Sequence, residues 1–97
     1  MTLPDKFTGM IEREEVNRMR WAARRGMLEL DLVLEPFVAS QYELLSESDR
    51  HCFQQLMLSE DQDLFAWFMQ RAKPDDEALA QIVSKILQFA HTAPEDR

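Results

Sequence analysis

The residues whose types and spacing could support chemistry gather in one short stretch, "RRGMLE", from Arg24 to Glu29. Arg25 and Glu29 are a cation and a carboxylate four residues apart, and Gly26, one of only two glycines in the chain, stands between them. Two uses fit this spacing. The pair forms a surface ion pair worth roughly 0.2–0.5 kcal/mol, or its charges bind a partner protein.

Two leucines accompany these charges. On a helix, Leu28 and Leu32 point away from the predicted core face and lie beside Glu29, and Arg25 projects to the same side if the turn at Gly26 is tight. Exposed leucines between charged residues are typical of a partner-binding patch. In the alternative interpretation, the first helix or the chain end covers Leu28 and Leu32.

The other chemically capable side chains form no recognisable site. His51 and His91 lie on separate predicted helices, without HxxxH or CxxC spacing, so we expect no metal site. His51 and Cys52 are neighbours that point about 100° apart on a helix, which argues against a catalytic pair. No glycine-rich loop is available to bind phosphate, and the aromatic residues of "FAWFM" recur at the spacing of a helix core. The sequence therefore predicts no catalytic, metal-binding or cofactor-binding residue.

The length and composition limit the kind of protein. A chain of 97 residues buries roughly 60–65% of its unfolded surface, enough for one core but not for a deep active site as well. We expect a single domain over residues 1–97, with an ordered core from about 11 to 90, that is not an enzyme. The net charge of −7 argues against nucleic acid as a partner, because a phosphate-binding surface is normally basic.

The sequence carries no recognisable signal for secretion or membrane insertion. No stretch approaches the ~20 apolar residues that a membrane-spanning helix needs, and the N-terminus has no basic segment followed by an apolar one. Cys52 is the single cysteine and cannot form an internal disulfide, which fits a reducing compartment. We expect a cytoplasmic protein without direct membrane insertion.

The charges are unevenly distributed. Residues 1–25 carry a net charge of +2, and residues 26–97 carry −9. The basic element is either a solvated helix face or an electrostatic docking surface.

Helix signals dominate the chain, which has four prolines and no NG, DG or GG pair. We predict an all-α fold with helices over 11–23 and 27–42, a third opened by Ser46, a fourth over 60–72 opened by a Ser59–Gln62 capping box, and a last one over 75–92. Gly26 is predicted to cap the first helix at its C-terminus. The predicted core residues of these helices are Val16, Met19, Ala23, Met27, Leu30, Val33, Leu34, Phe37, Val38, Cys52, Phe53, Leu56, Met57, Leu64, Phe65, Phe68, Ala72, Leu79, Ile82, Val83, Ile86, Leu87 and Ala90.

The second helix is ambiguous in its pattern. Leucines at every second position from 28 to 34 have the period of a half-buried strand. A lone strand among helices would have no partner for its backbone groups, so we predict a helix, bent or interrupted near Pro36.

The stretch from Arg25 to Glu29 also fits the RGxxE motif, and the chain resembles the SdhE-type succinate dehydrogenase assembly factors. The resemblance covers roughly residues 14 to 90 and includes "WAARRGMLELDLVLEPF", Tyr42, "DQDLFAWFM" and "KPDD" in the same order. It implies a compact five-helix bundle that acts as a monomeric assembly factor. Such factors bind the flavoprotein subunit of succinate dehydrogenase, and in some bacteria that of fumarate reductase. They promote covalent attachment of FAD to a histidine of that subunit.

The resemblance also implies roles for individual residues. Arg25 and Glu29 dock and orient the partner, and Gly26 lets its backbone approach closely. Leu28, Arg24 and Trp21 complete the implied partner-binding set. The factor itself binds no FAD, and it acts by holding the partner's histidine and flavin in attack geometry. Two alternatives are a carrier that binds FAD directly and an acidic interaction module of a toxin–antitoxin-type pair.

Overall fold

The computed structural model describes residues 13–92, which form five α-helices and one 3-10 turn. The prediction of an all-α bundle of five helices is confirmed, and no strand occurs within this described range. The elements are α2 (Arg13–Ala22), α3 (Leu28–Gln41), η1 (Tyr42–Leu44), α4 (Glu47–Leu56), α5 (Asp61–Phe68) and α6 (Glu77–Ala90). The predicted start of the first helix, at residue 11, lies outside the described residues.

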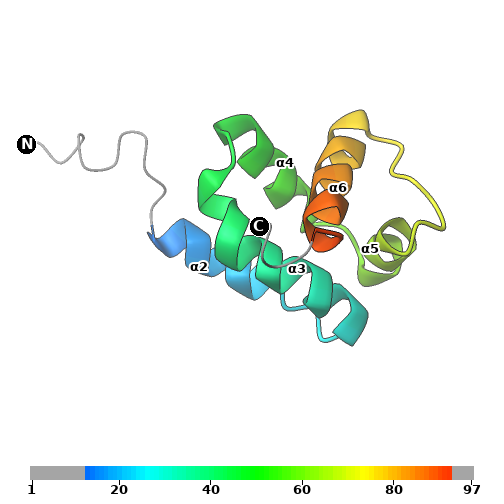
Figure 1. Ribbon diagram of the computed structural model, residues 1–97, viewed down its shortest axis with the longest axis horizontal. Coiled ribbons are helices and arrows are strands. Elements are labelled where there is room, and N and C mark those ends of the chain that lie inside the picture. The colour runs from blue at the N-terminus through cyan, green and yellow to red at the C-terminus, as the bar shows by residue number, and fades with distance from the viewer. Residues whose placement is uncertain (1–12, 93–97) are drawn as a thin grey trace, which may run out of the picture.

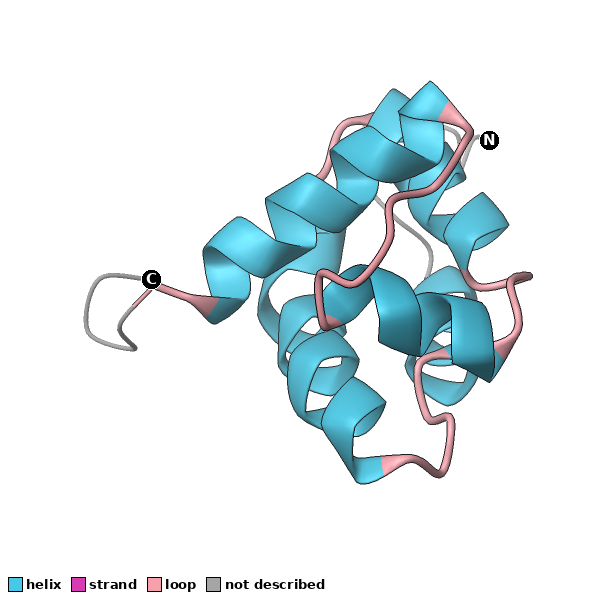
Figure 2. Ribbon diagram, turned by 90° about the vertical axis from the view of Figure 1, so that its right-hand side faces the viewer, coloured by secondary structure: helices cyan, strands magenta, loops and turns pink. Residues whose placement is uncertain are grey.

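Helix α3 is the central element. It contacts α2, α5 and α6, while α4 packs on α6. Figure 1 shows α2 alongside α3 at the lower edge of the molecule, with α4, α6 and α5 above them. The quarter-turn view of Figure 2 shows the same helices joined by short loops, the longest of which leads from α5 into α6. The pair α2–α3 therefore forms one side of the bundle.

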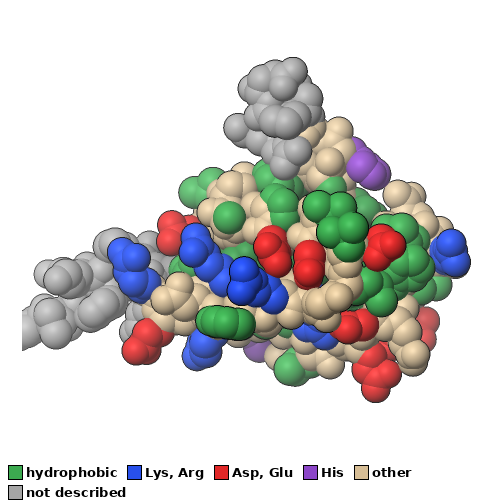
Figure 3. Space-filling model, turned by 90° about the horizontal axis from the view of Figure 1, so that it is seen from below, with side chains coloured by type: hydrophobic (Ala, Val, Ile, Leu, Met, Phe, Trp, Pro, Cys, Tyr) green, Lys and Arg blue, Asp and Glu red, His purple; other side chains and the backbone are tan. Residues whose placement is uncertain are grey.

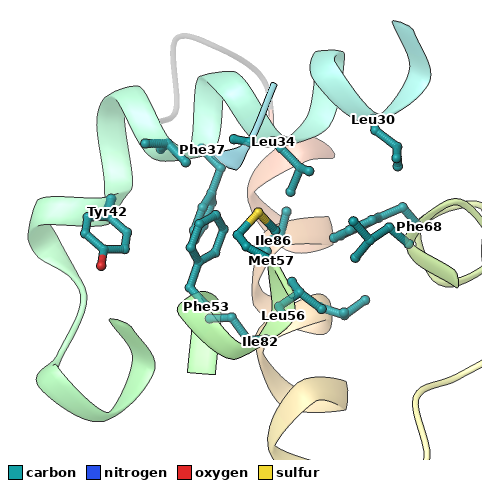
Figure 4. Packing of buried hydrophobic residues seen from close by; sticks show 14 of the residues in the cluster. Leu30, Leu34, Phe37, Tyr42, Phe53, Leu56, Met57, Phe68, Ile82 and Ile86 are labelled. Carbon is teal, nitrogen blue, oxygen red and sulfur yellow. The ribbon is translucent and has the colours of Figure 1, made fainter. Parts of the chain in front are cut away.

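The core lies between α3, α4, α5 and α6. Leu34 and Phe37 of α3 lie towards Phe53 of α4 and Ile86 of α6, and Leu30 lies towards Phe68 of α5 (Figure 4). The Phe37 and Phe53 rings stack with their centroids 5.8 Å apart. Burial of four α3 residues at helical spacing, the fourth being Val38, confirms that this segment is a helix and explains why its other leucines face outward.

The predicted core is largely correct. The buried hydrophobic residues are Val16, Ala23, Leu30, Leu34, Phe37, Val38, Tyr42, Phe53, Leu56, Met57, Leu64, Phe68, Ile82, Val83 and Ile86. Ala72 is an error, because it is exposed and lies beyond the end of α5.

The predicted break in α3 and the predicted start of α5 need correction. Helix α3 runs without interruption through Pro36, which lies on the exposed side of the helix. The carbonyl left without a donor by this proline belongs to Leu32, also on the exposed side, where water can bond it. Helix α5 begins after Glu60, so the predicted Ser59–Gln62 capping box is not formed.

The end of α5 was also predicted too late. The helix stops at Phe68 because Gln70 adopts a left-handed conformation with φ of +61°. The amide of Arg71 then donates to the Ala66 carbonyl at 2.8 Å, and that of Gln70 to the Trp67 carbonyl at 3.1 Å. This pair of bonds is a Schellman ending, formed here without glycine.

The predicted cap of α4 is confirmed, since the Ser46 hydroxyl accepts a bond from the Asp49 amide at the start of this helix. The last predicted helix, over 75–92, forms as α6 over Glu77–Ala90. Its N-cap is Asp76, for which no cap was predicted from the sequence and which accepts bonds from the amides of Ala78 and Leu79.

Candidate functional site

The glycine of the motif lies in the turn between α2 and α3. Residues 23–27, here called the motif turn, join the two helices, and Gly26 is exposed with φ of +82°. This left-handed conformation is the one that a capping glycine adopts, but α2 has already ended at Ala22. Gly26 therefore sets the direction of the turn rather than capping α2. A Cβ built at this position would meet no atom within 4 Å, so the chain itself leaves the space beside it open.

The Arg25 side chain is turned into the molecule. Its Nε donates to Asp61 Oδ1 at 2.8 Å, and its Nη1 donates to the carbonyls of Ala22 and Met57 at 2.9 and 3.0 Å. Its Nη2 donates to the Ser59 carbonyl at 2.8 Å, and only 16% of the side chain is exposed. One guanidinium thus ties the end of α2 to the connection between α4 and α5.

This anchoring corrects two expectations. Arg25 does not project to the side of Leu28 and Leu32, and its ion pair is formed with Asp61, not with Glu29. The reason is geometric, since the planar guanidinium reaches three carbonyls and a carboxylate that converge on the inner side of the motif turn. A contact between Arg25 and a partner stays a prediction.

The backbone of the motif turn is held from the other side by α3. The Arg25 amide donates to Asp31 Oδ1 at 2.9 Å, which places an acidic side chain of the first helical turn across the connection. Met27, at the N-cap of α3, makes no side-chain capping bond. The Asp31 carboxylate therefore helps to fix the chain where it enters α3.

The outer side of the turn is a face of large exposed side chains. Trp21 is 70% exposed, and Leu28 and Leu32 are 66% and 65% exposed, so α2 does not cover the leucines. The Arg24 guanidinium carbon lies 5.4 Å from the centre of the Trp21 ring. Glu29 is exposed and forms no ion pair with any described residue. We call these five side chains, with Gly26, the motif face.

A shallow hollow of about 390 Å³ adjoins the motif face. We call it the α2–α3 groove, because one wall comes from α2 and the other from α3. Its lining residues are Asn17, Arg20, Trp21, Arg24, Glu35, Val38 and Ala39. Most of the basic side chains visible in Figure 3 lie in its left half, over α2, with acidic ones among them, and most of the acidic side chains lie over the rest of this surface. Arg24 Nε stands 3.6 Å from Glu35 Oε2, across the groove.

A second polar cluster ties α2 to η1 and α4. The Tyr42 hydroxyl donates to Glu15 Oε2 at 2.7 Å and accepts from Gln54 Nε2 at 2.9 Å. Burial raises the pKa of the Tyr42 phenol to about 12, because the charged phenolate would lose its hydration. His51 is exposed and Cys52 is half-buried on α4. The cluster fixes α2 in place and has no arrangement suited to catalysis.

The part of the chain that the structure describes offers no metal-binding group of three or more His, Cys, Asp or Glu side chains. Nor does any helix between residues 13 and 92 have the length and apolar character needed to cross a membrane.

Comparison with known families decides what kind of protein carries the motif face. The family model described as the flavinator of succinate dehydrogenase matches residues 17–90, which contain the motif turn, the motif face and the α2–α3 groove. The chain belongs to this family. The family resemblance drawn from the RGxxE motif and its companion stretches is thus confirmed.

Relatives of the flavinator family match over most of their length. A protein of Pseudomonas savastanoi pv. phaseolicola is 50% identical over 78 residues, which are 80% of this chain and 93% of the relative. One of Idiomarina loihiensis is 49% identical over 74 residues, or 76% and 82% of the two chains. One of Aliivibrio fischeri is 43% identical over 79 residues, or 81% and 92%. Each is named FAD assembly factor SdhE.

The structure brings the predicted partner-binding residues together in one region but divides them between its surface and its interior. Gly26, Leu28, Glu29, Arg24 and Trp21 lie on the motif face, and Arg25 lies beneath it. Sequence reasoning gave no role to Asp61, although the companion stretch "DQDLFAWFM" begins with it. Its place in a stretch that resembles the family was the signal that could have indicated a role for Asp61. Arg20 was counted among the basic residues of the N-terminal segment but was not connected with the motif.

Proposed function

We propose that this chain promotes covalent attachment of FAD to the flavoprotein subunit of succinate dehydrogenase. Its membership of the flavinator family carries the proposal, and its SdhE relatives are named FAD assembly factors. The chain is an assembly factor in this proposal and not an enzyme, because the histidine, the flavin and the reacting atoms belong to the partner. The toxin–antitoxin alternative finds no support in this family.

The motif face is the proposed contact surface. Leu28 and Trp21 supply exposed apolar area of the kind that forms the centre of protein interfaces. Glu29 and Arg24 supply charges beside it, and Gly26 leaves room for a partner's backbone. Arg25 contributes from beneath, because it fixes the turn that carries these groups.

The proposed mechanism is positional. Binding favours a conformation of the flavoprotein in which its histidine approaches the flavin methyl carbon in attack geometry. Holding two groups in a near-attack arrangement removes part of the entropic barrier, and this needs no reactive group on the factor. We expect the chain to bind no FAD itself, to act as a monomer and to work in the cytoplasm.

Reconstitution with purified components tests the proposal. The flavoprotein subunit of succinate dehydrogenase is incubated with FAD, with and without this chain, and covalent flavin is followed by in-gel fluorescence after denaturation. We expect a clear increase in rate with the chain present. An unchanged rate would overturn the proposed function. The same assay with the fumarate reductase flavoprotein tests the second client that the resemblance implies.

A matched pair of variants separates the motif face from the rest of the surface. Glu29→Ala removes an exposed carboxylate of the motif face, and Glu43→Ala removes an exposed carboxylate of η1. Both should leave the melting temperature nearly unchanged, because exposed single charges contribute about 0–1 kcal/mol. We expect flavinylation to slow by about tenfold or more with Glu29→Ala alone, since losing a charge buried against a partner costs about 2–5 kcal/mol of binding. Equal rates for the two variants would exclude Glu29 from the contact.

A further inference from the structure

The motif face and the α2–α3 groove form one continuous strip. On α3, Leu28, Leu32, Glu35 and Ala39 follow at intervals of four, three and four residues, which places them on one side of the helix. The first two belong to the motif face, and the last two line the groove. The eleven steps from Leu28 to Ala39 correspond to a strip about 16 Å long at a rise of about 1.5 Å per residue.

The other wall of the groove is basic. Asn17, Arg20 and Trp21 recur at the spacing of one face of α2, and Arg24 of the motif turn lines the same wall, so two of these four residues are arginines. Arg20 is exposed and forms no ion pair with any residue between 13 and 92. Among the described residues, Arg24 has one loose ion pair, with Glu35 at 3.6 Å. The groove therefore presents positive charge that the described chain does not neutralise.

This charge stands out because the chain as a whole carries a net charge of −7. An acidic chain gains solubility from its carboxylates and has no general need for an arginine such as Arg20, which pairs with no described carboxylate and lies beside an exposed tryptophan. Figure 3 shows the basic side chains collected on the α2 side of this surface. Charge complementarity indicates an acidic occupant, and Trp21 at 70% exposure indicates that an apolar group accompanies the acids.

We propose that the α2–α3 groove binds an acidic segment of the flavoprotein subunit, and that this segment continues onto the motif face. Carboxylates of the segment pair with Arg20 and Arg24, and an apolar side chain packs against the Trp21 ring. The groove then supplies affinity and register at a distance from the motif turn, while Gly26 and Glu29 meet the part of the partner nearest the flavin. This inference rests on the proposed function, because the flavoprotein is its partner.

Two charge reversals on the same helix test the proposal. Arg20→Glu places a carboxylate in the groove, whereas Arg18→Glu makes the same change in net charge at an exposed position that does not line it. Binding to the purified apo-flavoprotein is measured by titration calorimetry at low and moderate salt. We expect the dissociation constant to rise about tenfold or more for Arg20→Glu and less than about threefold for Arg18→Glu. Both variants should melt like the unmodified chain, since both arginines are exposed.

The outcomes separate this inference from the function on which it rests. Equal weakening by both variants would show general attraction between charged surfaces and would overturn a specific site in the groove. Unchanged binding with Arg20→Glu would overturn it as well. An unmodified chain that binds no flavoprotein would overturn the proposed function itself.

A photo-crosslinking residue at position 20, with position 18 as control, identifies the occupant directly. We expect position 20 to label an Asp- or Glu-rich segment of the purified flavoprotein, mapped by peptide mass spectrometry, and position 18 to label it weakly. A crosslink from position 20 to a basic or uncharged segment would overturn the proposal. A crosslink between two copies of this chain would assign the groove to self-association instead.

Discussion

Replacing Arg25 by alanine should destabilise the chain strongly, although a surface location would predict almost no effect. The substitution removes four hydrogen bonds, to Asp61 and to the carbonyls of Ala22, Met57 and Ser59. These bonds join segments up to 36 residues apart in the sequence. Their loss frees the motif turn from the connection between α4 and α5.

The magnitude follows from burial. Removing one partner of a fully buried ion pair costs about 3–5 kcal/mol, and an exposed pair contributes about 0–1 kcal/mol. The Arg25 side chain is 16% exposed, so its loss should cost nearly as much as the loss of a buried partner. The Asp61 side chain is 41% exposed, so water can hydrate its carboxylate once Arg25 is removed. The three carbonyls also become accessible to water where the side chain is removed. We therefore expect a loss of about 2–4 kcal/mol, or about 10–25 °C in melting temperature for a domain of this size.

Thermal and urea unfolding, followed by circular dichroism, measure this loss. Arg24→Ala is the matched control, because the ion pair that this neighbouring arginine forms with Glu35 is loose and exposed, and the substitution should cost no more than about 1 kcal/mol. The stability of Arg25→Lys should lie between those of the two alanine variants. A lysine ammonium can keep the ion pair with Asp61 but lacks the planar guanidinium that bonds three carbonyls. Equal stability of Arg25→Ala and Arg24→Ala would refute the anchoring role.

Substitutions at three further positions examine the backbone and the buried phenol. Gly26→Ala should cost roughly 1 kcal/mol of stability, because alanine is strained at the φ of +82°. Gly26→Val, assayed where ~95% of the variant is folded, should abolish flavinylation if the partner fills the open space beside position 26. A normal rate of flavinylation with Gly26→Val would exclude that contact. Gln70→Gly should raise the free energy of unfolding by about 0.5–1 kcal/mol in urea, because glycine accepts φ of +61° without strain. The pKa of Tyr42 is raised to about 12 in the fold, so stability present below about pH 10 is lost as pH rises towards 12. Tyr42→Phe should remove this pH-dependent component, which is on the order of 1 kcal/mol between about pH 8 and about pH 11, where urea midpoints are compared.

Much of the fold could be predicted because its signals are local. Helical spacing of Leu30, Leu34 and Phe37 indicated which side of α3 is buried, and the polar cap Ser46 marked where α4 begins. The end of α5 could not be predicted in the same way. Its left-handed residue is Gln70, and sequence rules assign that conformation to glycine or asparagine.

The division of the candidate site was outside the reach of local rules. The spacing of Arg25 and Glu29 says that both can lie on one helix side, but the motif turn places Arg25 before α3 begins. Its direction is decided by Asp61 and Ser59, which the fold brings to it from the α4–α5 connection. A contact over such sequence separation has no periodic pattern, so only the assembled structure reveals it.

This division changes how effects of motif substitutions are interpreted. The five residues of the motif combine an internal anchor at Arg25 with external groups at Gly26, Leu28 and Glu29. A misplaced turn is therefore enough to cause loss of flavinylation in an Arg25 variant, even without a lost contact between Arg25 and the partner. Only the external residues report on the interface directly, because their side chains touch little of their own chain. A measured defect at Arg25 becomes a statement about binding only after the folded fraction has been set equal in the two proteins.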